Sequence, residues 1–543
     1  MPDPADGPGE HIAAGPAGSG ALVHDPVLEQ ARIRPTAVAL IGPDRSLTFG
    51  ELREAALSVA ARLAEAGVGV GDPVGIVLEK GVDQQVAVFG ALLAGAAFVP
   101  IDVAAPQARR AGLLARVTTT VVTRSRYTGG LPPGMTVVDV DRPDEPGRAA
   151  WAAVPRRGVP DGVANMLFTS GSTGEPKCVV VTHRAIAHAL ARTRERYPVA
   201  TGDRSLAVTA LHHDMSLFDT FGMLGAGAAT VLPDPARDRD AEHWAELVGR
   251  HGVTTWTSVP AMLEMLLEHD PAAAAGLRQV FLGGDRIPLG LVDALAAHAP
   301  RARVVSVGGP TETTLWNIWF PIAGRDPVWR SVPYGRPLPG NEYHLLDDRL
   351  QDTAPGEIGT LYCSGTGVTL GYHADPARTA AAYVPHPRTG TRMFRTGDLG
   401  RRLPDGTIEF CGRGDRQLQI GGHRVEPGEI EAVLAGHAGV HHAVVVPGRR
   451  DRDGRVRGLV AWIRPESGKA PDPEELTRHA GAALPPHMVP GRVLIRTELP
   501  LTRNGKIDHR ELERAAADGA AAGPSDTLSA VDAALAARFG GRG

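Results

Sequence analysis

The chain has 543 residues, of which 43% are hydrophobic and 22% are charged, an ordinary balance for a folded globular protein. A single hydrophobic core stops growing well below this length, so we expect two or more domains. The formal net charge of -4 lacks the basic excess of a dedicated nucleic-acid-binding protein, so no nucleic-acid partner is expected.

The sequence also predicts no targeting signal, no membrane span and no cysteine-based site. The first 20 residues are acidic and rich in glycine and proline, without the basic start and apolar run of a secretory signal. The most apolar stretch, 86–101, is interrupted by two glycines and a proline and is shorter than the roughly 20 residues that a membrane span needs. Cys178, Cys363 and Cys411 show no CxxC spacing. We therefore expect a cytoplasmic protein with no membrane association, disulfide or thiolate metal site.

Helical and strand-like patterns alternate along most of the chain, after a tail at 1–20 whose composition predicts disorder. The patterns predict helices that include 86–98 and 292–299, and strands at 119–123, 229–233 and 304–309. The apolar stretch around 86–101 is expected to be a buried helix that leads into a strand. This alternation predicts an α/β fold of layered, largely parallel sheets.

The C-terminal part has a different pattern, which begins after a turn-rich segment at 403–422. The sequence there predicts a helix at 424–437, strands at 441–448 and 457–465, and a helix at 473–484. These elements are typical of a small α+β domain. We therefore expect a large N-terminal domain over 21–414, a small C-terminal domain over 415–513, and a tail over 514–543 that could hold a short helix.

A polar loop at 169–177 lies between two strand-like runs and combines hydroxyls, glycines and a lysine. Its residues are Thr169, Ser170, Gly171, Ser172, Thr173, Gly174, Glu175, Pro176 and Lys177. Glycines let backbone N–H groups approach phosphate oxygens, hydroxyls donate further hydrogen bonds, and a lysine supplies charge. The spacing is not that of a Walker-type loop. By composition alone, a polar hairpin explains the segment equally well.

The sequence of this loop closely resembles the phosphate loop of the adenylate-forming superfamily, which includes acyl-CoA synthetases, luciferases and adenylation domains of nonribosomal peptide synthetases. Cys178 stands where that family has glycine. Further segments resemble the family's other motifs in the same order, at 47–52, 92–102, 308–314, 356–372, 394–400, 412–431, 484–490 and 504–508. The chain is identified as a member of this superfamily, of the stand-alone adenylation-domain type.

The resemblance implies a set of residues for ATP and Mg²⁺. The ATP-binding residues would be Thr169, Ser170, Gly171, Ser172, Thr173, Gly174, Lys177, Gly309, Asp398 and Arg413. Asp398 would accept the ribose hydroxyls. Thr311 and Glu312 would lie at the catalytic centre, with Glu312 as the Mg²⁺ ligand, because this metal prefers hard oxygen donors. Lys506 would be the catalytic lysine that stabilises charge on the α-phosphate, and Asp415 would be the hinge between the domains.

The motif at 308–314 also departs from the family pattern. The family commonly has an aromatic residue that stacks on adenine immediately before Gly-Pro-Thr-Glu, whereas this chain has Gly308 there. The sequence therefore leaves the aromatic partner of adenine unassigned.

The segment 212–219 resembles the F-D-x-S motif of family members that activate amino acids, with His213 in place of the usual phenylalanine. Asp214 would pair with the substrate ammonium, because a buried cation needs a carboxylate partner. A helix-capping aspartate is the alternative. The implied specificity residues are Asp214, Met215, Phe218, Thr257, Phe281, Gly283, Val307, Leu315, Trp316 and Lys506. This bulky, otherwise uncharged lining predicts a small amino acid, with glycine or alanine favoured and serine tolerated.

The second half-reaction of the family needs a thiol. Gly421 and Gly422 fall where the family's loop lines the tunnel for a phosphopantetheine arm, and no carrier motif follows Lys506. The resemblance therefore predicts a phosphopantetheinylated carrier protein that acts in trans. Two alternatives stay open: a coenzyme-A ligase for a small carboxylic acid, and a non-catalytic homologue that serves as an interaction module.

Overall fold

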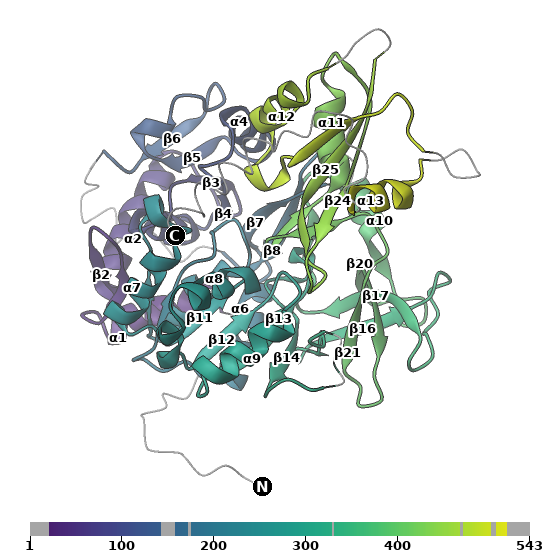
Figure 1. Cartoon of the computed structure of the whole chain (residues 1–543). Coiled ribbons are helices and arrows are strands. Elements are labelled where there is room, and N and C mark those ends of the chain that lie inside the picture. The colour runs from purple at the N-terminus through teal and green to yellow at the C-terminus, as the bar shows by residue number, and fades with distance from the viewer. Residues whose placement is uncertain are drawn as a thin grey trace.

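The computed structural model describes residues 21–142, 158–171, 175–327, 329, 331–466, 471–500 and 507–517. Within these residues the chain forms a large body of layered sheets and helices, and a smaller α+β unit packs against one side of it (Figure 1). The predicted α/β class, with a large N-terminal and a small C-terminal part, is confirmed. Among the described residues, no helix has the length and apolar character that crossing a membrane requires.

A seven-stranded sheet contains the strands on either side of the polar loop. Its order is β18-β8-β7-β4-β3-β5-β6, and the strands from β7 to β6 run parallel. The predicted strand at 119–123 is β5, whose four residues are all buried, as expected for a parallel strand covered on both faces. The strands are β3 (Pro73–Val77), β4 (Ala97–Pro100), β5 (Thr120–Thr123), β6 (Thr136–Asp139), β7 (Val163–Thr169), β8 (Lys177–Thr182) and β18 (Gly371–Tyr372).

A nine-stranded sheet, in the order β15-β14-β13-β12-β11-β9-β10-β1-β2, lies beside it. Its central strands from β13 to β1 are parallel, so the carboxyl ends of β11, β12 and β13 meet at one edge, where open α/β sheets bind ligands. The strands are β1 (Val38–Ile41), β2 (Ser46–Thr48), β9 (Arg204–Leu206), β10 (Ala229–Val231), β11 (Thr255–Ser258), β12 (Gln279–Leu282), β13 (Arg303–Gly308), β14 (Ile318–Ile322) and β15 (Arg336–Pro337).

Helices cover both of these sheets. The helix predicted at 86–98 ends at Leu93, and Gly95 has a φ of +83°, which turns the chain into β4. Both elements are buried on every side, so periodicity alone could not divide them. The helices of the large part are α1 (Asp25–Ile33), α2 (Phe49–Glu65), α3 (Val82–Leu93), α4 (Gln107–Val117), α6 (His183–Arg196), α7 (Ala241–His251), α8 (Pro260–His269), α9 (Leu289–His298) and α10 (Pro376–Ala382), with 3₁₀ turns η1 (Ser125–Tyr127), η3 (Pro235–Arg237), η4 (Pro271–Gly276) and η5 (Thr311–Thr313).

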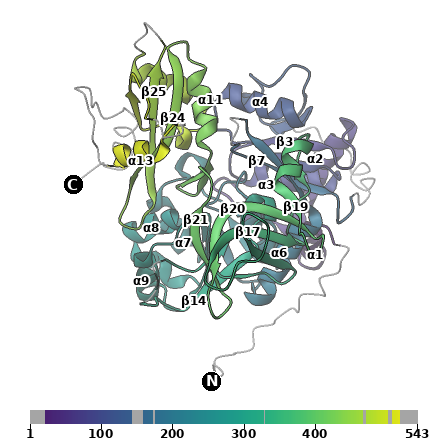
Figure 2. The same ribbon diagram turned by 90° about the vertical axis from the view of Figure 1, so that its right-hand side faces the viewer.

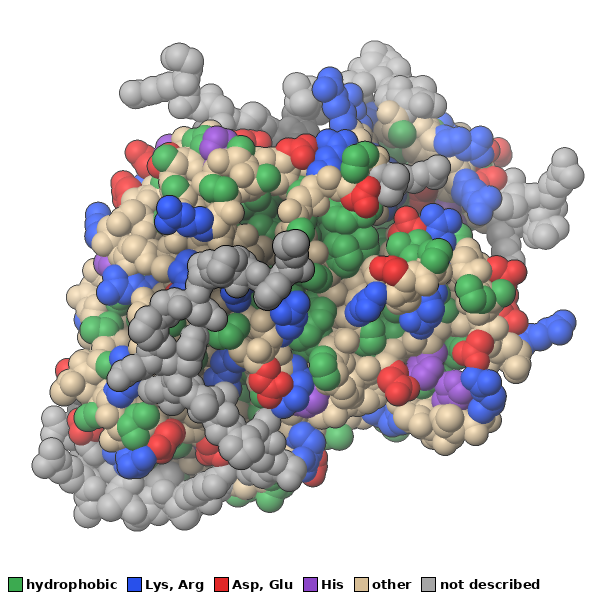
Figure 3. Space-filling view, turned by 90° about the horizontal axis from the view of Figure 1, so that it is seen from below, with side chains coloured by type: hydrophobic (Ala, Val, Ile, Leu, Met, Phe, Trp, Pro, Cys, Tyr) green, Lys and Arg blue, Asp and Glu red, His purple; other side chains and the backbone are tan. Residues whose placement is uncertain are grey.

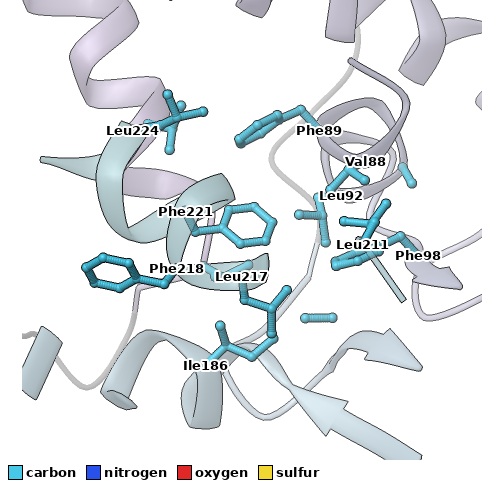
Figure 4. Packing of buried hydrophobic residues seen from close by; sticks show 14 of the residues in the cluster. Val88, Phe89, Leu92, Phe98, Ile186, Leu211, Leu217, Phe218, Phe221 and Leu224 are labelled. Atoms are coloured by element: carbon cyan, nitrogen blue, oxygen red, sulfur yellow. The ribbon is translucent and has the colours of Figure 1, made fainter. Parts of the chain in front are cut away.

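The main core lies between the two sheets and includes a π-helical turn, η2 (Phe218–Met223). Phe221 points toward Phe89 and Phe98, and its ring centroid lies 5.4 Å from that of Phe89 (Figure 4). Phe218 leaves the opposite side of the same turn (Figure 4). π-Helical turns are rare and occur mostly at functional sites. This one follows the segment that contains Asp214.

A five-stranded antiparallel sheet completes the large part and faces the viewer in Figure 2. Its strands are β16 (Asn341–Leu346), β17 (Ile358–Gly365), β19 (Tyr383–Pro385), β20 (Arg392–Arg402) and β21 (Ile408–Arg413). Strand β21 runs directly into the small unit, so the last large-part strand lies next to the junction.

The small unit has the elements that the sequence predicts. The predicted helix at 424–437 begins only at Pro427, because His423–Val425 pairs with β22 as a strand. Helices α11 and α12 cover one face of its three-stranded sheet and α13 covers the other, against Trp462. The elements are β22 (Leu418–Ile420), β23 (His423–Val425), α11 (Pro427–Ala435), β24 (Val440–Arg450), β25 (Val456–Pro465), α12 (Pro473–Ala483), η6 (Pro486–Met488), β26 (Arg492–Ile495) and α13 (His509–Ala517). The expected tails lie outside the described residues, except for α13 at the start of the last one.

Candidate active site

A cavity of about 660 Å³ lies where the two sheets of the large part meet the β22–β23 hairpin of the small unit. Its wall includes many of the residues that the sequence singles out: Thr169, Ser170, Asp214, Val307, Gly309, Thr311, Asp398, Arg413 and Asp415. Charged side chains of both signs are intermixed on the face of the molecule seen from below (Figure 3). The polar and charged residues of its wall make the cavity the natural focus for a polar ligand.

The polar loop connects β7 to β8, which pair antiparallel with Thr169 opposite Lys177. Ser172, Thr173 and Gly174 lie outside the described residues. Ser170 donates from its hydroxyl to the backbone carbonyl of Arg424 at 2.7 Å. A side chain at Gly171 would place its Cβ 1.8 Å from the carbonyl oxygen of Glu175, so the loop closes tightly on itself. The sequence predicted this strand–loop–strand arrangement.

Glu312 follows Thr311 of the cavity wall and is completely buried. Tyr372 donates to its Oε1 at 2.8 Å, and Arg424 donates to its Oε2 at 2.8 Å. The ammonium of Lys177 lies 3.8 Å from Oε1. Burial opposes ionisation of Glu312, but the charges of Arg424 and Lys177 prevail and lower its pKa to about 2. Glu312 is therefore a carboxylate at neutral pH, held by one cation from each part of the chain.

Lys177 is buried between opposite charges. Its ammonium also lies 3.8 Å from Glu426, which follows β23. Burial and the neighbouring Arg424 charge lower the pKa of Lys177 to about 8. A polyanion that enters the cavity would favour the charged form of this lysine, because an opposite charge raises the pKa of an ammonium.

Asp398 and Arg413 face each other across the β20–β21 pair. Arg413 donates to Asp398 Oδ1 at 2.5 Å and binds both oxygens of Asp415 at 2.7 and 2.8 Å. Burial raises the pKa of Asp398 above its usual value. Gly412, immediately before Arg413, has a positive φ of +108°. The end of β21, next to the small unit, therefore contains a residue in a conformation that favours glycine. The structure brings together the predicted ribose acid, arginine and hinge aspartate.

Asp214 lies in the turn before η2 and is 6% exposed, on the cavity wall. Its Oδ1 lies 3.3 Å from Nδ1 of His213, and the other ring nitrogen of His213 lies 3.3 Å from the carbonyl oxygen of Gly422 in the small unit. Burial disfavours the charged imidazole, but the hydrogen bond and charge of Asp214 raise the pKa of His213. A buried carboxylate with one weakly held partner remains available for a cationic ligand.

The raised pKa of His213 predicts how the free energy of unfolding depends on pH. Because this pKa exceeds the unfolded value of about 6.5, the contribution of the pair should be complete below that pH and should be lost as the pH rises through the folded pKa. We expect the difference in unfolding free energy between the wild type and Asp214→Asn, from urea denaturation, to be larger at pH 6 than at pH 9. The comparison cancels the titration of other buried histidines. A difference that is constant over this range would contradict the pairing.

The implied specificity residues cluster behind Asp214. Phe218, Phe281 and Trp316 pack on one another with ring centroids 5.0 to 5.6 Å apart, and the indole N–H of Trp316 donates to Thr193 at 2.9 Å. Thr257 and Phe281 are partners on β11 and β12. Of the described specificity residues, Asp214 and Val307 line the cavity, whereas Met215, Phe218, Thr257, Phe281, Gly283, Leu315 and Trp316 do not. The three aromatic side chains therefore form a packed block outside the cavity wall.

One predicted catalytic residue lies outside the described part of the chain, and the sequence analysis missed two residues of the site. Lys506 lies outside the described residues, and the next residue, Ile507, packs with Trp462 on the outer face of the small sheet. Sequence reasoning assigned no role to Arg424 or Tyr372, although both stand inside the matched motifs. A buried glutamate requires a cation, and this requirement is the signal that could have pointed to an arginine.

Comparisons with known proteins agree with this geometry. The family model described as AMP-binding enzyme matches residues 27–373, and the model described as AMP-binding enzyme C-terminal domain matches residues 429–506. The anguibactin system regulator of Vibrio anguillarum is 36% identical over 520 residues, which cover 91% of this chain and 47% of that protein. The chain thus spans about half the length of this curated relative.

Two solved structures are also similar. The nonribosomal peptide synthetase FmoA3, in its form bound to α-methyl-L-serine-AMP, is 37% identical with a TM-score of 0.70, covering 92% of this chain and 50% of that one. PA1221, described as a nonribosomal peptide synthetase protein containing adenylation and PCP domains, is 25% identical with a TM-score of 0.81, covering 97% and 93%. The chain therefore belongs to the AMP-binding enzyme family and, within it, to the adenylation domains of the nonribosomal peptide synthetase type.

Proposed function

We propose that this chain uses ATP to convert a small amino acid into its aminoacyl-adenylate and then transfers the acyl group to the phosphopantetheine thiol of a carrier protein. The observation that carries the proposal is Asp214, a buried carboxylate on the wall of the same cavity that Lys177 and Glu312 flank. An amino acid is a zwitterion. Its ammonium needs a carboxylate partner in the protein, while its own carboxylate reacts with ATP.

In the first half-reaction, an oxygen of the amino-acid carboxylate attacks the α-phosphorus of ATP. A mixed anhydride forms, and the bond to pyrophosphate breaks. We assign Asp214 to the substrate ammonium, Lys177 and the loop 169–174 to the phosphates, and Asp398 to the ribose hydroxyls. Lys506 is proposed to stabilise the negative charge that develops between carboxylate and α-phosphate. Thr311, on the cavity wall at the start of η5, is proposed to donate to the α-phosphate.

The residues present suit a Mg²⁺ ion that binds together with ATP. Mg²⁺ commonly takes one or two protein carboxylates and completes its shell with phosphate oxygens and water. Glu312 is such a carboxylate, and no cluster of three potential ligands exists among the described residues, so the nucleotide would supply the remaining oxygens. When bound, the metal would offset phosphate charge. Arg424 holds Oε2 of Glu312 in this structure, so the hairpin that carries Arg424 must withdraw before Glu312 can bind Mg²⁺.

In the second half-reaction, a thiolate attacks the acyl carbon of the adenylate, a thioester forms and AMP leaves. The β22–β23 hairpin lies in the cavity in this structure, with Gly422 against Val259 at the start of α8. We propose that this arrangement serves thioester formation and that Asp415 is the hinge for the other orientation. PA1221, which contains a PCP domain, supports a carrier protein as the thiol donor.

Gly422→Ala should separate the two half-reactions. Gly422 has a φ of +82°, and a Cβ there would lie 2.1 Å from Cγ1 of Val259. We expect thioester formation to fall roughly 10-fold or more, because strain and contact together cost at least ~1.4 kcal/mol, while pyrophosphate exchange changes little. Gly421→Ala is the matched control, since Gly421 also has a positive φ, of +55°, but nothing lies within 4 Å of its Cβ position. An equal loss in exchange would contradict the assignment.

The substrate is proposed to be glycine or alanine, with serine as a third candidate. We propose that the packed block of Phe218, Phe281 and Trp316 closes the substrate pocket at its inner end and so excludes a long side chain. FmoA3 binds α-methyl-L-serine-AMP, which supports a small or hydroxylated side chain.

A pyrophosphate-exchange panel tests the proposal. Glycine, alanine and serine should support exchange, and their des-amino counterparts acetate, propionate and 3-hydroxypropionate should not. Exchange only with the carboxylates would favour the coenzyme-A ligase. No exchange with any acid, from protein that still binds ATP, would favour the interaction module. Hydroxylamine trapping over the twenty amino acids and several β-amino acids would then rank the substrates.

A further inference from the structure

Gly308, the last residue of β13, lacks the aromatic side chain that related sequences carry immediately before Gly-Pro-Thr-Glu. In the structure, a side chain from another segment occupies the space that this aromatic ring would fill. A Cβ built on Gly308 would lie 2.1 Å from Cε2 and 2.9 Å from Cδ2 of Tyr334. Real Cβ atoms do not approach other atoms this closely, so the Tyr334 ring occupies the space into which a side chain at position 308 would point.

Tyr334 is held rigidly in that place. The next residue, Gly335, exchanges two backbone hydrogen bonds with Ile408, at 3.0 and 2.8 Å. A side chain at Gly335 would place its Cβ 1.9 Å from the carbonyl oxygen of Trp319, so the backbone here lies directly against β14. The ring of Tyr334 also packs against two other rings. Its centroid lies 6.2 Å from that of Tyr343 and 5.8 Å from that of Phe410. Such edge and tilted contacts fix the plane of a ring before any ligand binds.

The ring reaches the nucleotide end of the cavity. Tyr334 lines the cavity together with Gly308, Gly309 and Asp398. Burial and the nearby Asp398 charge raise the pKa of Tyr334, so the phenol stays neutral. Asp398 is the residue proposed to bind the ribose, and in a nucleotide the base is bonded directly to the ribose.

We propose that Tyr334 is the aromatic platform on which the adenine of ATP stacks, in place of the side chain that Gly308 lacks. The assignment rests on the proposed ATP-dependent function. Flat aromatic bases stack on tyrosine through dispersion and removal of apolar surface from water, and the hydroxyl is not required for this contact. Tyr334 is thus a binding residue that comes from a segment 26 positions after the usual one.

The test measures nucleotide binding directly, without an amino acid, from the fluorescence of etheno-AMP and by calorimetry with ATP. Tyr334→Leu should weaken both affinities about 10- to 100-fold, the range expected for one lost base-stacking contact. The affinity for inorganic tripolyphosphate, which has no base, should stay within about twofold. Tyr334→Phe should retain the affinity. Phe410→Leu removes a neighbouring ring that packs against Tyr334, and it should weaken both affinities less than Tyr334→Leu does.

A reciprocal exchange addresses folding. The variant Gly308→Tyr with Tyr334→Gly moves the ring to the usual position and should bind ATP more tightly than Tyr334→Leu does. Unchanged ATP binding in Tyr334→Leu would overturn the proposal, as would a larger loss in Phe410→Leu or an equal loss for tripolyphosphate. The proposed function fails independently if no amino acid supports exchange, because the nucleotide measurements do not use one.

Discussion

Asp214→Asn is expected to lower kcat/KM for glycine or alanine in pyrophosphate exchange by at least ~30-fold. Removing one partner of a buried charge pair costs about 2 to 5 kcal/mol, which corresponds to roughly 30-fold to several thousand-fold in kcat/KM. The substitution keeps the size of the side chain, and Asp214 has only the 3.3 Å contact with His213 to lose. The KM for ATP should remain within about threefold, because the phosphates contact other residues.

Two controls make this result specific. Asp285→Asn removes a second aspartate of the same cavity wall and should leave amino-acid turnover nearly unchanged. Propionate, which lacks the ammonium, should fail to support exchange in Asp214→Asn as in the wild type, so the loss is specific to substrates that carry the ammonium. Turnover of glycine and alanine that is unaffected by Asp214→Asn would eliminate the amino-acid assignment and leave only ATP-dependent activation of an acid.

Lys506→Ala should reduce the formation of the adenylate about 100- to 1,000-fold. Charge develops on the α-phosphate and the attacking carboxylate at the same time, and removing one group that stabilises such charge costs roughly 3 to 4 kcal/mol. Because the transition state is affected more than the ground state, kcat should fall while the KM values for ATP and amino acid change little. A single-turnover measurement of adenylate formation, with saturating ATP and amino acid, reports the rate of this chemical step.

The matched control is Lys469→Ala, which removes a lysine outside the matched motifs. Transfer from a chemically synthesised aminoacyl-adenylate to a carrier thiol should survive in Lys506→Ala, because that step does not make the phosphoanhydride. If Lys506→Ala slowed both half-reactions equally, the lysine would have a general structural role. If it slowed neither, the chain would use another cation.

The elements of the fold were largely predictable, and the deviations have a common cause. The predicted strands at 119–123 and 304–309 correspond to β5 and β13, and the small unit has the predicted order of elements. The predicted helix at 86–98 is too long, because residues 94–98 remain apolar after the helix ends at Leu93. The helix predicted at 424–437 starts too early, because the pairing of residues 424–425 with β22 depends on a turn that periodicity does not reveal.

The site was predictable only where its residues stand together in a motif. Asp214, Glu312 and Asp398 were each assigned from short segments, and all three are buried at or beside one cavity. Arg424, by contrast, reaches Glu312 across 112 residues, and Tyr334 reaches Gly308 across a bend of the chain. Neither contact has a local signature, because the two partners come from different elements.

The amino-acid sequence by itself determined the family, the alternation of helices and strands, and the residue types available for phosphate, ribose and ammonium. These follow from local spacing and from side-chain chemistry, which a linear chain already contains. Only the tertiary structure decided that Arg424 holds Glu312, that the β22–β23 hairpin lies in the cavity, and that the ring of Tyr334 fills the space beside Gly308. The physical reason is that buried charge and close packing are satisfied by whichever group the fold brings near, regardless of its distance along the chain.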